Sequence, residues 1–183
     1  MRLFVAVPLG AEARDALAER LAPARRAAPP GLRWIAPENW HFTLQFLGHT
    51  EEAAVAPLQA ALRAAASARA PFAIALEAAG AFPNQHHARV VWVGVAAGAV
   101  ELSALADGVT RATAALGFAA EARAFQPHLT VARLKRPASV ERTLAAMTFS
   151  EVRQAVRNIV LYRSHLAQSG ARYEALARFP LGR

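Results

Sequence analysis

The stretch Trp40-His41-Phe42-Thr43-Leu44-Gln45-Phe46-Leu47-Gly48 has a counterpart further along the chain, Gln126-Pro127-His128-Leu129-Thr130-Val131-Ala132-Arg133. Both stretches contain His-x-Thr with apolar residues at the alternate positions. Successive side chains of a strand point to opposite faces of the sheet. Each stretch therefore predicts a strand with one face on the core and an imidazole and a hydroxyl on the other. Fewer than one such triplet is expected by chance in a chain of this composition.

Hydrophobic periodicity and turn residues predict the remaining elements. Strands are expected at Leu3–Val7, Phe72–Leu76, Arg89–Val95, Val156–Tyr162 and Arg172–Phe179, with a short extended piece at Arg33–Ile35; the His128 strand should close near Leu134. Helices are expected at Ala11–Leu21, Glu51–Ala68 (kinked or delayed by Pro57), Val100–Leu116 and, capped by Ser139, up to Met147. Loops are expected after Pro23 and over Gly80–Ala88, and Phe118–Ala124 is open between loop and edge strand.

The order of these elements repeats. Strand, helix, His-x-Thr strand, helix and strand describe Leu3–Leu76, and they describe Val91–Tyr162 again. The repeat predicts one domain, 1–183, built from two related lobes of roughly 1–88 and 89–183, and it allows strands to be exchanged between the lobes. Lobes related by a pseudo-twofold axis would let the two His-x-Thr strands face each other across a cleft.

Two facing His-x-Thr pairs suit phosphoryl transfer. An imidazole titrates near pH ~6.5, so one histidine can take a proton from a nucleophile while the other gives one to a leaving group. The hydroxyls of Thr43 and Thr130 can bind the non-bridging oxygens of a phosphate. Arg133, three residues after Thr130, can offset the negative charge, although a surface arginine that closes a strand is the alternative.

Amino-acid composition limits the classes of binding partner but does not identify one. The 183-residue chain has a net charge of +8 and no cysteine. The charge fits a polyanion such as RNA, and equally a solvated surface in an arginine-rich proteome. The longest apolar run, Val90–Val100, is too short to span a bilayer. We expect a cytoplasmic monomer without membrane attachment.

The remaining histidines and aromatic residues have plainer interpretations. His86 and His87 lack a carboxylate or cysteine at ligand spacing, so we expect a surface loop and no metal or cofactor. His49 is expected in a turn and His165 on the surface. Trp92 is expected in the core. Trp34 and Phe82, in predicted loops, are open to stacking on a base.

These motifs resemble the two-histidine phosphoesterase superfamily and, within it, the bacterial RNA 2′,3′-cyclic phosphodiesterases, once named 2′-5′ RNA ligases. The resemblance covers nearly the whole chain. It is carried by Arg2–Val7, Trp34, Pro37–Leu44, Phe46–Gly48, Pro127–Arg133 and Leu161–Ser164.

The resemblance implies a bilobed α+β fold with two antiparallel sheets around a basic cleft. It implies that His41 is the proton donor, that His128 is the proton acceptor, and that Thr43, Thr130 and Arg133 bind the phosphate. The implied reaction opens a 2′,3′-cyclic phosphate of an RNA end or a nucleotide to a 2′-phosphomonoester without metal. The alternatives are the reverse reaction, a 2′-5′ RNA ligation, and a non-catalytic RNA-binding module.

Overall fold

The computed structural model describes residues 1–121, 123–148, 150–167 and 170–182. Its strands are β1 (Arg2–Pro8), β2 (Leu32–Trp34), β3 (His41–His49), β4 (Phe72–Phe82), β5 (Ala88–Ala97), β6 (His128–Ala138), β7 (Val152–Val156), β8 (Asn158–Ala167) and β9 (Gly170–Pro180). Its helices are α1 (Ala11–Arg20), α2 (Ala22–Arg26), α3 (Val55–Ser67), α4 (Ala99–Ala114) and α5 (Glu141–Ala145), with 3-10 turns η1 (Pro37–Asn39) and η2 (Glu52–Ala54). Within these residues no helix is long and apolar enough to cross a membrane.

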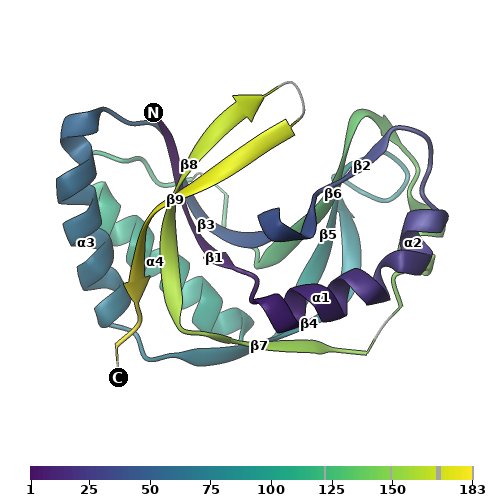
Figure 1. Ribbon diagram of the computed structural model, residues 1–183, viewed down its shortest axis with the longest axis horizontal. Coiled ribbons are helices and arrows are strands. Elements are labelled where there is room, and N and C mark those ends of the chain that lie inside the picture. Colours follow the sequence, from purple (N-terminus) through teal and green to yellow (C-terminus); the bar gives the residue numbers. More distant parts are fainter. Residues whose placement is uncertain (122, 149, 168–169, 183) are drawn as a thin grey trace.

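Two antiparallel sheets make up the two lobes (Figure 1). One sheet has the strand order β3-β1-β8-β9, and the other has the order β2-β6-β5-β4-β7. Each sheet contains strands from both halves of the sequence, because β8 and β9 join the first and β2 and β4 join the second. The predicted α+β fold with two antiparallel sheets is confirmed.

The helices cover the outer faces of the sheets and close the core. Helices α3 and α4 pack on each other beside β3, β8 and β9, while α1 lies against β7 and α2 against α5 (Figure 1). Strand β1 lies between β3 and β8, and its apolar residues Leu3 to Val7 are almost fully buried there. The buried residues of the two helices that pack against this core include Leu58, Leu62 and Ala66 of α3 and Leu102, Leu105 and Val109 of α4.

The backbone passes from one sheet to the other within a segment that the sequence pattern predicts to be a single strand. The expected strand Val156–Tyr162 is in fact the end of β7 and the start of β8. Strand β7 pairs with β4, whereas β8 pairs with β1 and β9. The backbone therefore crosses between the sheets at Arg157, a change of partner that local periodicity does not contain.

Other boundaries also differ from expectation. Pro23 does not break the chain into a loop but lies in the first turn of α2, where its missing N–H costs nothing. Strand β4 continues to Phe82 past a bulge near Ala78, whose φ is 65°, so the predicted loop from Gly80 is too long. Ser139 does not cap α5; its hydroxyl bonds Glu141, and Val140 holds the capping position. The described residues of the Phe118–Ala124 segment form neither helix nor strand.

A buried polar contact anchors β3 to α4. Gln45 is 2% exposed, and its side-chain carbonyl accepts a 2.8 Å hydrogen bond from the hydroxyl of Thr113, which is 0% exposed. The Gln45 amide donates to the Ala119 carbonyl at 3.4 Å. This contact fixes β3, an edge strand of its sheet, against α4.

Replacing Thr113 by valine is expected to destabilise the fold by about 1–3 kcal/mol, because the Gln45 carbonyl would stay buried without a donor. Urea unfolding monitored by circular dichroism measures the change. Thr110→Val in the same helix, at a half-buried position, is the matched control. An unchanged midpoint in Thr113→Val would show that the contact contributes nothing.

Candidate active site

Equivalent β-bulges shape the two His-x-Thr strands. In β3, Thr43 lies opposite Ala6 and Gln45 opposite Val5, which leaves Leu44 as the extra residue. In β6, Thr130 lies opposite Trp92 and Ala132 opposite Val91, which leaves Val131 as the extra residue. A bulge of this kind inserts one residue and shifts the alternation of the residues that follow.

The bulge explains how Arg133 joins the site. Strict alternation from His128 and Thr130 would turn Arg133 to the core face with Leu129. Val131 and Ala132 are both 0% exposed, and after them Arg133 is exposed. The extra residue therefore puts His128, Thr130 and Arg133 on one face of β6. The spacing in the sequence identifies Arg133 as a candidate, but only the pairing of β6 with β5 shows to which face of the strand its side chain points.

Each histidine is held by the backbone two residues before it. The Nδ1 of His41 lies 2.7 Å from the Asn39 carbonyl oxygen, and the Nδ1 of His128 lies 2.7 Å from the Gln126 carbonyl oxygen. A carbonyl oxygen only accepts, so both rings carry hydrogen on Nδ1 and donate it. Nε2 of both rings is then the atom left for proton transfer.

An aromatic cluster of Phe4, Tyr162 and Tyr173 surrounds His41. Its ring centroid lies 5.0 Å from that of Phe4, 5.1 Å from that of Tyr173 in an edge-on contact, and 6.2 Å from that of Tyr162. Burial among these rings lowers the pKa of His41 to about 4, although the hydrogen bond to Asn39 opposes the shift. Burial also raises the pKa of Tyr162.

The structure brings the two His-x-Thr strands together. The charges of Arg133 and His128, both on β6, are lesser causes of the low pKa of His41. Strands β3 and β6 contact each other although they belong to different sheets, and Figure 1 shows them meeting between the lobes. Thr43 and Thr130 are half-buried, on the same strand faces as their histidines.

His128 packs against aromatic residues of its own sheet. Phe82 contacts its ring edge-on at 5.2 Å and lies 5.3 Å from the ring of Trp92. Trp92 pairs with Thr130 and with Gly80, so it shares the face of the site and is half-buried. A Cβ on Gly80 would overlap the indole, which is why glycine is required there. The expectation that Trp92 is a core residue is wrong.

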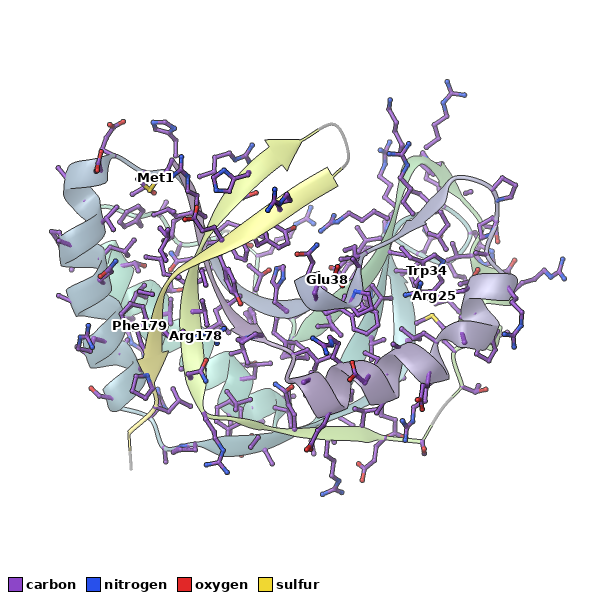
Figure 2. The ribbon with its side chains drawn as sticks, viewed as in Figure 1. Met1, Arg25, Trp34, Glu38, Arg178 and Phe179 are labelled. Carbon is purple, nitrogen blue, oxygen red and sulfur yellow. The ribbon has the colours of Figure 1, made fainter. Side chains whose placement is uncertain are left out.

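Trp34 does not line the site. Its neighbour Arg33 pairs with Arg133 and shares the site face, which turns Trp34 to the other side of β2. There the indole packs on the core beneath Arg25, whose guanidinium lies 5.2 Å from the ring centroid (Figure 2). Trp34 is therefore not available to stack on a base.

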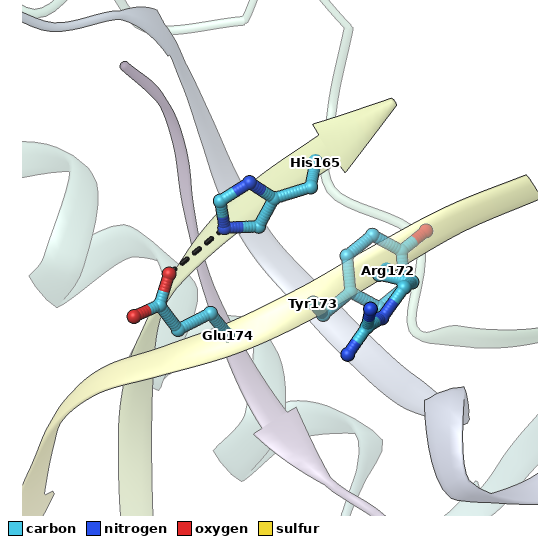
Figure 3. A pocket seen from close by; sticks show the side chains of 4 residues that line it. All are labelled: His165, Arg172, Tyr173 and Glu174. Carbon is cyan, nitrogen blue, oxygen red and sulfur yellow. Dashed lines mark hydrogen bonds and ion pairs between the residues drawn. The ribbon is translucent and has the colours of Figure 1, made fainter. Parts of the chain in front are cut away.

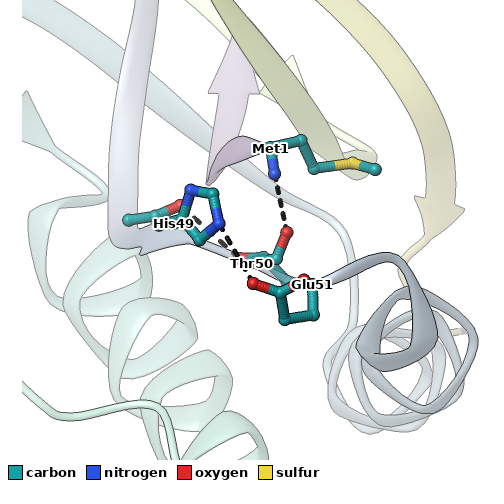
Figure 4. Close-up of polar contacts among 5 residues, drawn as sticks. Met1, His49, Thr50 and Glu51 are labelled. Atoms are coloured by element: carbon teal, nitrogen blue, oxygen red, sulfur yellow. Dashed lines mark hydrogen bonds and ion pairs between the residues drawn. The ribbon is translucent and has the colours of Figure 1, made fainter.

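The remaining histidines form surface contacts. His49 lies 3.1 Å from Glu51, beside the bond from the Met1 amino group to the Thr50 carbonyl (Figure 4). His86 lies 3.5 Å from Glu141, and His87 is exposed. Among the described residues no group of three or more His, Cys, Asp or Glu side chains is placed to hold a metal ion. Metal-independent chemistry stays a prediction.

One pocket lies on the β8–β9 hairpin. It has a volume of about 420 Å³, and its described lining is His165, Arg172, Tyr173 and Glu174 (Figure 3). His165 and Glu174 bond each other at 2.8 Å. Tyr173, which also contacts the ring of His41, connects this pocket with the candidate site.

The acid sensitivity of the fold tests the burial of His41. Because its pKa is lower in the folded protein, the unfolded chain binds more protons between about pH 4 and the ordinary histidine value of 6.5. Stability should fall as the pH falls through this window, by up to about 3 kcal/mol from this residue. Urea unfolding at pH 7 and pH 4.5 measures the loss, which should be smaller in His41→Gln. An equal loss in the variant would place the acid-sensitive group elsewhere.

The arrangement of paired His-x-Thr strands between two antiparallel sheets defines a two-histidine phosphoesterase. The family model described as "LigT like Phosphoesterase" matches this chain twice, over residues 7–92 and 93–173. The chain belongs to the LigT-like phosphoesterase family.

Named relatives and solved structures agree with this assignment. An RNA 2′,3′-cyclic phosphodiesterase of Archaeoglobus fulgidus is 36% identical over 98% of this chain and 99% of its own length. One of Geobacillus stearothermophilus is 36% identical over 97% of this chain, which spans 56% of that relative. A structure from Thermus thermophilus has a TM-score of 0.81 at 31% identity, covering 99% of this chain and 98% of that chain. E. coli LigT complexed with 3′-AMP has a TM-score of 0.75 at 29% identity, covering 100% and 98%.

Proposed function

We propose that this protein hydrolyses the 2′,3′-cyclic phosphate of RNA ends and nucleotides to a 2′-phosphomonoester, without a metal ion. The observation that carries the proposal is the pair of bulged His-x-Thr strands, β3 and β6, which contact each other although they belong to different sheets. The relatives named above support the substrate class.

The reaction follows from the roles of the two Nε2 atoms. His128 takes a proton from water, and the water oxygen attacks phosphorus. The bond from phosphorus to the 3′ oxygen breaks, and His41 gives its proton to that oxygen. The hydroxyls of Thr43 and Thr130 donate to the non-bridging oxygens, and Arg133 balances their charge. One water is consumed, one P–O bond forms and one breaks.

The order of the two roles rests on the family resemblance. Both rings have the same backbone hydrogen bond, so their geometry does not separate acid from base. A proton donor at His41 must be protonated, whereas in the free protein burial lowers its pKa to about 4. The proposal therefore requires that the bound phosphate anion raise the pKa of His41, as an opposite charge does.

The wider features of the protein belong to the same proposal. The double family match supports a single domain that arose from two related lobes. Exposed cations at the end of the second sheet, Arg33, Arg89, Arg133 and Lys135, would attract the phosphates of an RNA strand. We propose that the protein is a cytoplasmic monomer. Its substrates there would be RNA ends.

Hydrolysis of adenosine 2′,3′-cyclic phosphate in the presence of EDTA tests the proposal. The expected product is adenosine 2′-phosphate alone, at a rate that EDTA leaves unchanged. The same assay with an RNA oligonucleotide that ends in a cyclic phosphate, with and without a 5′-hydroxyl RNA, measures hydrolysis against 2′-5′ ligation. Binding of RNA without any turnover would contradict the proposal and favour a non-catalytic module.

A further inference from the structure

Arg33 lies directly opposite Arg133 in the second sheet. Strands β2 and β6 are antiparallel neighbours (Figure 1), and their register pairs the two arginines without a bulge. Side chains of directly opposed residues point to the same face, with their Cβ atoms about 4.5–5.5 Å apart. Both side chains are exposed. Arg33 therefore shares the site face with Arg133, the residue that is proposed to balance the charge of the cyclic phosphate.

This pair of like charges has no counter-ion in the protein. Like charges directly opposite each other destabilise a sheet. Among the described residues neither guanidinium has an acidic side chain within salt-bridge distance, whereas Arg14 and Arg153 each bond a neighbouring carboxylate. A charge on an edge strand such as β2 can prevent pairing with another chain, but that role does not require a second cation opposite it. The pair therefore indicates an anionic ligand that spans both arginines.

The other positions of the same row across the sheet are apolar. Strand β5 places Val90 opposite Arg133, and β4 places Phe82 opposite Val90. The ring of Phe82 contacts His128 edge-on. In this row the cation next to Arg133 is Arg33, on the edge strand β2. A polyanion that extends from the phosphate at Arg133 would therefore continue toward β2.

We propose that Arg33 binds the phosphodiester group one nucleotide upstream of the cyclic phosphate, which makes the site prefer the end of an RNA chain to a cyclic mononucleotide. This inference rests on the proposed function. An RNA chain that ends in a 2′,3′-cyclic phosphate has such a diester on the 5′ oxygen of its last nucleotide, and a cyclic mononucleotide has none. A guanidinium suits this group because its parallel N–H donors match the non-bridging oxygens. Arg133 then contacts the reacting phosphate and Arg33 the preceding one.

Two dinucleotides that differ by a single charge test the proposal in the full-length protein. Both end in a 2′,3′-cyclic phosphate, and one has a neutral methylphosphonate in place of the internal phosphodiester. For the wild type, kcat/KM should be roughly tenfold higher for the diester than for the methylphosphonate. Arg33→Ala should reduce this ratio to nearly one, and Arg33→Lys should keep part of it, since lysine keeps the charge.

The dependence of KM on salt gives a second readout. For the diester substrate, the slope of log KM against log salt concentration should decrease by about 0.7 in Arg33→Ala, the value for one phosphate contact of a single strand. For the methylphosphonate substrate, the same substitution should leave the slope as it is in the wild type.

Arg111→Ala is the matched control. Arg111 is exposed on α4, away from the sheet face of the site, so this variant loses the same charge elsewhere on the protein. Its ratio of kcat/KM for the two dinucleotides should equal that of the wild type. A ratio near one in Arg111→Ala would assign the preference to net charge and would overturn the inference.

The outcomes separate this inference from the proposed function. If Arg33→Ala slows both dinucleotides equally, Arg33 acts on the reacting phosphate or supports β2, and the inference is wrong. If the ratio in Arg33→Ala stays as in the wild type, or is already near one in the wild type, Arg33 does not bind the upstream diester and the inference is also wrong. If the wild type hydrolyses neither dinucleotide nor adenosine 2′,3′-cyclic phosphate, the proposed function itself fails and this inference falls with it.

Discussion

Replacing either His41 or His128 by alanine is expected to lower kcat for a 2′,3′-cyclic nucleotide by roughly 10²–10⁴-fold. Each ring supplies one proton transfer, and the other ring cannot supply both because each is tied to its own backbone carbonyl. The double variant should lose little more than the worse single variant, because groups that act as one unit are not additive. Steady-state kinetics with purified variants measures the effect.

His87→Ala is the matched control for this experiment. The imidazole of His87 is exposed in the loop between β4 and β5, and its backbone N–H, which the variant keeps, is what bonds Asn84. Its activity should equal that of the wild type. Circular dichroism should show that all variants are folded. Activity within tenfold of the wild type in either catalytic variant would contradict the assigned roles.

Arg133→Ala is expected to lower kcat/KM by roughly 10²-fold, because the guanidinium would no longer stabilise the charge on the phosphate oxygens in the transition state. Arg133→Lys should recover part of this loss, since lysine keeps the charge but not the two parallel donors. Kinetics at low and high salt should show that the difference is not a general loss of surface charge.

The control for Arg133 lies on the same strand. Arg136 is exposed three residues further along β6, so Arg136→Ala removes the same charge from the same strand. It should change kcat/KM by less than about threefold, since it does not reach the phosphate. Equal losses in Arg133→Ala and Arg136→Ala would assign the effect to net charge and would remove Arg133 from the site.

The sequence predicts the chemical groups of this site better than their directions. His-x-Thr on an apolar strand identifies His41, Thr43, His128 and Thr130 because a period of two needs no knowledge of the neighbours. The direction of Arg133 depends on the bulge at Val131, which is set by the pairing of β6 with β5. The exposure of Phe46 has the same origin, because strict alternation assigns it to the core, whereas the bulge at Leu44 leaves it 59% exposed.

Pairing between strands that are distant in sequence also explains which features of the fold could not be predicted from the sequence. The aromatic cluster around His41 joins Phe4 of β1 with Tyr162 and Tyr173 of the β8–β9 hairpin, which is far from β1 in sequence and lies beside it only in the folded sheet. The crossing between β7 and β8 follows from partners in different sheets. The low pKa of His41 comes from this environment, so no local pattern could have indicated it.

The claim on which the proposed function depends is that both imidazoles reach one phosphate. A crystal structure of the protein soaked with adenosine 2′-phosphate tests it most directly. We predict the phosphate between β3 and β6, with Nε2 of His41 and Nε2 of His128 each within about 2.6–3.2 Å of one of its oxygens. A phosphate that contacts only one histidine, or that binds in the hairpin pocket at His165 and Arg172, would contradict the claim.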